Sequence, residues 1–130
     1  MVGAMALGAA RGLLGALERA GVPARALARY KLEHAALWRR MRDLALRYER
    51  SRLRGDEASL FKLHATRFAE RVARTIPALL PAAACVSSPL LRKKYRDVFA
   101  FEYMEGTSNI QLLNAYRQYV ASREDHAIAS

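Results

Sequence analysis

The chain has 130 residues, of which 52% are hydrophobic, so it fits one domain, residues 1–130, with a modest core, and its composition excludes a disordered protein. Its formal net charge of +10 favours an acidic partner: CoA phosphates, an acidic carrier protein, nucleic acid or an anionic membrane surface. A single cysteine, Cys85, excludes an internal disulfide and is consistent with a reducing compartment, so we expect a cytoplasmic protein.

The first predicted helix runs from Ala4 to about Ala20 and ends at Gly21 and Pro23. Its apolar positions fall on one face: Leu7, Ala10, Leu14 and Leu17. The segment lacks a basic start, and Arg11 and several glycines interrupt it, so neither a signal peptide nor a membrane span is favoured. Because it is so apolar, we expect it to leave an exposed patch on the isolated chain, and hence a homo-oligomer or a complex with another protein.

The second predicted helix should be the longest, because its apolar positions alternate spacings of three and four, as in a bundle seam: Leu27, Tyr30, His34, Leu37, Met41, Leu44 and Tyr48. We interpret His34 as a hydrogen-bonded core residue and not as a metal ligand. Seven arginines on its other faces and at its end form either a solvated surface or a docking surface for an acidic partner.

Two further helices are predicted before the C-terminal one. Asp56 or Ser59 can cap a third helix with the core residues Phe61, Ala65, Phe68, Val72 and Ile76, kinked near Pro77 and ended by about Pro81. After a loop in which Cys85 is expected to be buried, Ser88 and Pro89 predict the start of a short helix with Leu91, Tyr95, Val98 and Phe99 inside.

The last predicted helix begins at Thr107 or Ser108, and its apolar face should be Ile110, Leu113, Tyr116 and Val120 before it fades from about Ser122. No alternation typical of strands is present. The sequence therefore predicts an all-α fold, a bundle of four or five antiparallel helices. Periodicity predicts a core that includes Leu27, Leu37, Met41, Leu44, Phe68 and Val72.

Several kinds of site are not supported. The three histidines have no spacing to cysteine or glutamate that suits zinc or a di-iron centre, so no metal is expected. No phosphate-binding loop, dinucleotide fingerprint or nucleophile elbow is present. Nucleic acid is disfavoured as a partner, because the arginines follow one long helix and form no recognition motif.

One stretch suggests chemistry, Phe101–Arg117, which reads FEYMEGTSNIQLLNAYR. Its EGTSNIQ run, with Arg96–Asp97 before it and Arg117 after it, resembles the C-terminal helical domain of the acyl-CoA dehydrogenase family. The resemblance implies that Glu105 is the base that removes the α-proton of an acyl thioester while FAD takes the β-hydride. It also implies that Thr107, Ser108 and Asn109 contact the FAD. Judged without it, Glu105 is a carboxylate that interacts favourably with a helix dipole.

The resemblance also shows what the chain does not contain. Where the family carries an Arg-x-x-Phe-Gly element and a Gln, this chain has Ala24–Ala28 and Ala35, and its counterpart of a Gly-Gly-x-Gly loop is Ala82–Ser88. The family's N-terminal helical domain and middle β-domain are missing. Two hypotheses follow: a component completed by a partner chain, acting on acyl-CoA or an acyl carrier protein, or a helical binding module that has lost FAD and docks an acidic partner.

Overall fold

The computed structural model describes residues 2–50, 55–81, 87–104 and 108–129. In these ranges the chain is all-α and contains no strand. The helices are α1 (Val2–Arg19), α2 (Ala24–Glu49), α3 (Gly55–Leu79), α5 (Pro89–Ala100) and α6 (Ser108–Ala129). The predicted fold class is confirmed, and α2, with 26 residues, is the longest of these helices, as predicted.

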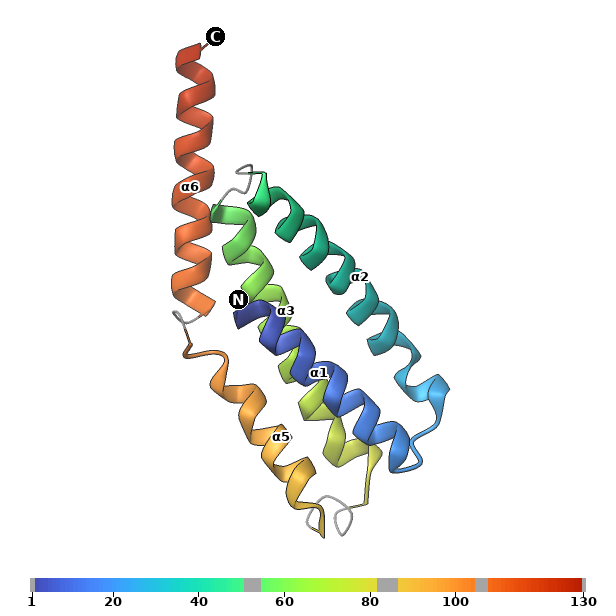
Figure 1. Cartoon of the computed structure of the whole chain (residues 1–130). Coiled ribbons are helices and arrows are strands. Elements are labelled where there is room, and N and C mark those ends of the chain that lie inside the picture. The colour runs from blue at the N-terminus through green and yellow to red at the C-terminus, as the bar shows by residue number, and fades with distance from the viewer. Residues whose placement is uncertain (1, 51–54, 82–86, 105–107, 130) are drawn as a thin grey trace.

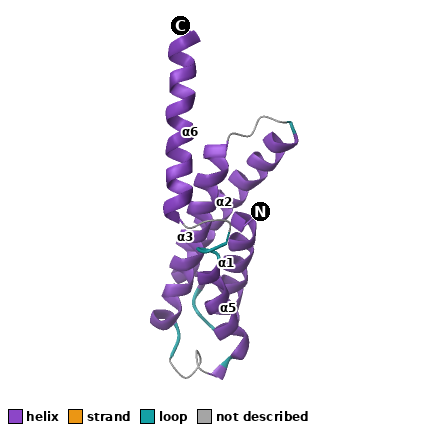
Figure 2. Ribbon diagram, turned by 90° about the vertical axis from the view of Figure 1, so that its left-hand side faces the viewer, coloured by secondary structure: helices purple, strands orange, loops and turns teal. Residues whose placement is uncertain are grey.

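The helices form a bundle in which α1 and α3 run in one direction and α2, α5 and α6 run in the other (Figure 1). Helix α3 lies at the centre, because it packs against each of the other four. Helix α6 lies against α3 near its start, and both views show its C-terminal part extending past the other helices (Figure 2). The bundle therefore has one protruding helical arm.

Local chemistry explains where the helices begin and end. Gly21 follows the end of α1 with a φ of 92°, a left-handed conformation that other residues rarely adopt. The Ser88 hydroxyl accepts a hydrogen bond from the Leu91 N–H at 3.2 Å, and Pro89 follows at the first helical position, which confirms the predicted start of α5. Helix α3 contains Pro77 and ends at Leu79, before Pro81, also as predicted.

The core lies between α1 and α3. The predicted stripe of α1 is buried, as are all five core residues predicted for α3, while Gly3 allows close contact because a Cβ there would lie 2.8 Å from the Phe61 ring. The exposed patch predicted on α1 is wrong, because α2, α3 and α5 all pack against this helix. Cys85 lies outside the described residues.

Helix α2 is less buried than its periodicity suggests. Leu27 and Leu44 are buried, Leu37 and Met41 are half-buried against the core, and Tyr48 is 72% exposed, so its predicted core position is wrong. The hydrogen bond predicted for His34 is present, because its Nε2 lies 3.1 Å from the Leu7 carbonyl oxygen.

Helix α6 differs from the prediction in two ways. It continues to Ala129 and does not fade at Ser122, because the segment contains good helix formers and neither glycine nor proline. Its apolar face is also not the buried one: Ile110 and Leu113 are 50% and 46% exposed, and the buried positions are Gln111 and Ala115. None of the described helices is long and apolar enough to cross a membrane.

Candidate functional site

The structure describes only part of the predicted catalytic segment. Glu105 and Thr107 lie outside the described residues. Ser108 is the first residue of α6, and the side chain of Asn109, next to it, is exposed. The predicted roles of these four residues therefore stay predictions, and the described residues on either side of the segment show how it is held.

The chain before Glu105 is fixed to α3. Phe101 is buried, and the turn after it is closed by a hydrogen bond of 3.3 Å from the Met104 N–H to the Phe101 carbonyl oxygen. The Lys62 side chain, only 7% exposed, donates a hydrogen bond from Nζ to the Met104 carbonyl oxygen. A buried ammonium group is costly unless it is hydrogen-bonded, so this contact ties Met104 firmly to α3.

The chain after the segment is fixed to the same helix. Gln111 and Ala115 of α6 are buried, and the glycine that starts α3 allows a close approach, because a Cβ on Gly55 would overlap the Gln118 amide. The described residues on both sides of the segment 105–107 therefore contact α3.

A second carboxylate lies near this region. Burial raises the pKa of Glu70 on α3, and the negative charge of Glu102 in the turn after α5 raises it further, while Arg74 and Arg67 oppose the shift. A carboxylate of raised pKa can hold a proton closer to neutral pH, as general acids and bases do. Sequence reasoning missed this pair, because the two residues are far apart in the chain and no motif joins them.

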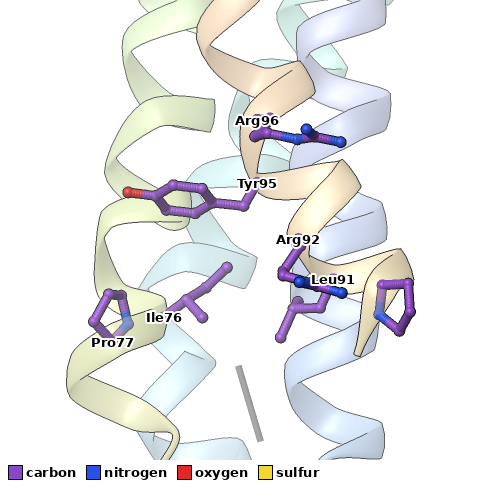
Figure 3. A pocket seen from close by; sticks show the side chains of 7 residues that line it. Ile76, Pro77, Leu91, Arg92, Tyr95 and Arg96 are labelled. Carbon is purple, nitrogen blue, oxygen red and sulfur yellow. The ribbon is translucent and has the colours of Figure 1, made fainter. Parts of the chain in front are cut away.

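A pocket with a volume of about 710 Å³ lies between α3 and α5. Figure 3 shows Ile76 and Pro77 on α3 facing Leu91 on α5, with Tyr95 projecting toward α3. Arg92 and Arg96 also line it. Helix α5 carries one carboxylate, Asp97, and it pairs with Lys93 at 2.6 Å. Among the described residues, the two pocket arginines therefore have no carboxylate partner on α5. The pocket is of small-molecule size and suits a ligand with an apolar part and a negative group.

The surface where α2 and α3 meet is strongly positive. The pKa of His64 is lowered, first by burial and then by the positive charges of Arg40, Arg67 and Arg71. We call the three arginines the cationic surface. Arg71 is partly neutralised by an ion pair with Glu33. Among the described residues, no group of three histidine, cysteine or carboxylate side chains could hold a metal ion.

The comparisons with known proteins give one result. Residues 1–120 match the family described as acyl-CoA dehydrogenase, C-terminal domain. The match includes Glu105 and the first half of α6. No curated protein and no solved structure matches the chain.

Proposed function

Because the chain belongs to the family of acyl-CoA dehydrogenase C-terminal domains, we propose that it is one component of a flavin-dependent acyl thioester dehydrogenase, completed by a partner chain. The observation that carries the proposal is the family match over residues 1–120, which includes Glu105. The lone cysteine suits a component that acts in the reducing cytoplasm. Acyl-CoA or an acyl carrier protein would bring the substrate.

Glu105 is assigned the role of base, and its carboxylate takes the α-proton of the thioester. Bound FAD supplies the acceptor for the β-hydride. Lys62 supports the base indirectly, because its ammonium group holds the carbonyl oxygen of Met104, the residue that precedes Glu105. A partner that covers the segment excludes water, which raises the pKa of a carboxylate and makes it a stronger base.

The groups that this chain offers to FAD are few. Thr107, Ser108 and Asn109 are assigned to it by the family motif, and the Asn109 side chain is exposed and accessible. At the start of α2, where the family has a cofactor-binding arginine, Ala24 is exposed and provides no polar side chain, although Arg25 beside it is an exposed cation. The residues present fit one edge of the cofactor, so the partner must bind the rest.

The partner needs a surface, and α6 offers one. Near Asn109 the exposed apolar side chains of α6 are Ile110, Leu112 and Leu113, each about half accessible. A run of large exposed apolar residues at the predicted site is typical of a surface that another protein covers. This supports a chain that is completed by a partner over one that works alone.

The test is Glu105→Gln in the complex copurified from the source organism, with an acyl thioester as substrate. Turnover should fall by about 10²–10⁴, because glutamine keeps the size of the side chain but cannot take a proton. Flavin reduction in a single turnover measures the step directly. Glu49→Gln, an exposed carboxylate on α2, is the matched control and should keep full activity. A Glu105→Gln complex that reduces flavin at the normal rate would refute the assignment.

The cationic surface favours a second candidate, a binding module without catalysis that docks an acidic partner such as an acyl carrier protein. Arg40, Arg67 and Arg71 concentrate positive charge on one side of the bundle, around His64. Binding should weaken steeply with salt and should be lost in Arg67→Glu. Such binding without any flavin in the copurified complex would favour this candidate over the enzyme component.

A further inference from the structure

The pocket between α3 and α5 has an apolar inner part and a cationic rim. Ile76 and Leu91, which line it from the two helices, are only 3% and 7% exposed, whereas Arg92 and Arg96 are exposed. Tyr95 projects between them and α3 (Figure 3). Apolar groups are stabilised by burial and charged groups by contact with water. A ligand that matches this arrangement has an apolar tail inside the pocket and a charged head group at the rim.

The walls of the pocket are held by contacts that do not need a ligand. The Tyr95 ring packs edge-on against Phe99, with 5.2 Å between the ring centroids, and the Arg74 guanidinium lies 5.5 Å from the Phe99 centroid. Pro77 and Pro89, one on each helix, have backbone φ angles that their rings fix. The pocket is therefore largely preformed, which reduces the entropy that binding must offset.

The two arginines of the rim are available to an anion. Arg92 and Arg96 lie one turn apart on α5, and their side chains extend to the same side of it (Figure 3). Among the described residues, neither forms an ion pair or a hydrogen bond. The sequence explains this, because residues 71–96 contain arginines and lysines but no aspartate or glutamate.

We propose that this pocket binds one free fatty acid, with the carboxylate between Arg92 and Arg96 and the alkyl tail between Ile76 and Leu91. A carboxylate has two oxygens in one plane, one for each guanidinium group, and such charge-assisted hydrogen bonds are the strong ones. The pocket lies at the N-terminal half of α5, where the helix dipole also favours an anion. An inorganic anion lacks the tail, and a neutral alcohol lacks the charge.

This proposal goes beyond the acyl thioester function and does not rest on it. The pocket residues lie on α3 and the first half of α5, whereas Glu105 follows the C-terminal end of α5. From Leu91 to Ala100 the helix rises by roughly 13 Å, so the two sites are separate. The test uses a free acid and measures neither flavin nor turnover. The two proposals can therefore fail separately.

The test is isothermal titration calorimetry of the full chain with dodecanoate below the concentration at which it forms micelles. One molecule should bind per chain. Octanoate, decanoate and dodecanoate should bind in increasing order, by about tenfold for each two CH₂ groups, because each CH₂ leaves water for the apolar part of the pocket. Dodecanol, which has the tail without the charge, should bind at least about tenfold more weakly than dodecanoate.

Arginine variants test the head group. Arg92→Gln and Arg96→Gln should each weaken dodecanoate binding by about tenfold, because each removes a charge-assisted hydrogen bond. Both side chains are exposed, so the fold should be kept, which circular dichroism checks. The matched control is Arg39→Gln, which removes the same charge from an exposed position on α2 and should bind dodecanoate as the unaltered chain does.

Methyl resonances in nuclear magnetic resonance spectra locate the tail. Addition of dodecanoate should shift the methyl signals of Ile76 and Leu91 in the pocket and leave that of Ile128, at the far end of α6, unchanged. Equal shifts at Ile128 would show attachment to apolar surfaces in general and would overturn the proposal.

Four other results would overturn it as well. The chain binds no dodecanoate, or it binds many molecules with no saturation at one. Arg39→Gln weakens binding as much as the pocket variants, which means attraction by net charge alone. The affinity does not depend on chain length, which removes the tail from the pocket. Coenzyme A without an acyl group binds as tightly as dodecanoate and is weakened by the same arginine variants, which makes the rim a phosphate site and not a fatty-acid site.

Discussion

The fold makes the carboxyl group of Glu70 harder to ionise. Burial raises its pKa above the ordinary value of 4.5, and the charge of Glu102 adds to the effect. The folded state therefore binds this proton more tightly than the unfolded state. The contribution of Glu70 to stability is greatest at low pH and is lost as the pH rises through the raised pKa. At pH 7 the ionised side chain costs stability.

Glu70→Gln should therefore raise the melting temperature at pH 7. The gain should shrink as the pH falls toward 4.5, because the side chain of the unaltered protein is then protonated as well. Thermal unfolding at several pH values measures both effects, with Glu49→Gln as a control for the change in net charge. A gain that is the same at every pH would mean that Glu70 acts through packing and not through its charge.

Single residues also show why the candidate site could be predicted only in part. Glu105 was singled out because the EGTSNIQ run resembles a family motif. Glu70 and Lys62 were not, since their importance comes from contacts with Glu102 and Met104, which only the packing of α5 and its following turn against α3 creates. Periodicity gives no information about such contacts between distant parts of a chain.

At the scale of elements, α2 provides a matched pair of positions on one predicted stripe. Leu44 is 6% exposed and Tyr48, one turn later, is 72% exposed. Leu44→Ala should lower the free energy of unfolding by roughly 2–5 kcal/mol, because it leaves a cavity in the core. Tyr48→Ala should change it by no more than about 0.5 kcal/mol, as surface substitutions usually do. Urea unfolding of both variants gives the comparison.

Equal losses from the two α2 variants would show that Tyr48 is covered in solution, for example by another chain. No loss from Leu44→Ala would remove Leu44 from the core. The pair also separates packing from sequence pattern, because periodicity placed both residues on the same face. What differs between them is how far the rest of the chain covers the side chain.

Helix α6 makes the same point on a larger scale. The spacing of Ile110, Leu113, Tyr116 and Val120 correctly indicated a helix and a shared face, but this face points outward. The side that packs on α3 carries Gln111 and Ala115, which a hydrophobicity pattern does not select. Periodicity tells which residues lie together on a helix, whereas the partner of that face depends on the rest of the assembly. The helices, their order and the core between α1 and α3 were predictable, because the two apolar faces that form this core belong to the same chain.

At the scale of the molecule, every other described helix packs against α3, and α6 keeps large apolar side chains exposed. Positive charge is distributed differently, on the cationic surface between α2 and α3 and on the two arginines of the α3–α5 pocket. These positive surfaces therefore use other residues than the exposed apolar side of α6.

The whole molecule also determines what the isolated chain can bind. We expect this chain alone not to retain FAD, because binding must offset the lost freedom of a large dinucleotide, and one exposed edge with Asn109 provides few contacts. Protein purified alone should be colourless, and added FAD should separate from it on gel filtration. The copurified complex should be yellow, since the partner supplies the remaining contacts. If the isolated chain keeps flavin through gel filtration, its own residues bind the cofactor and no completing partner is needed for it.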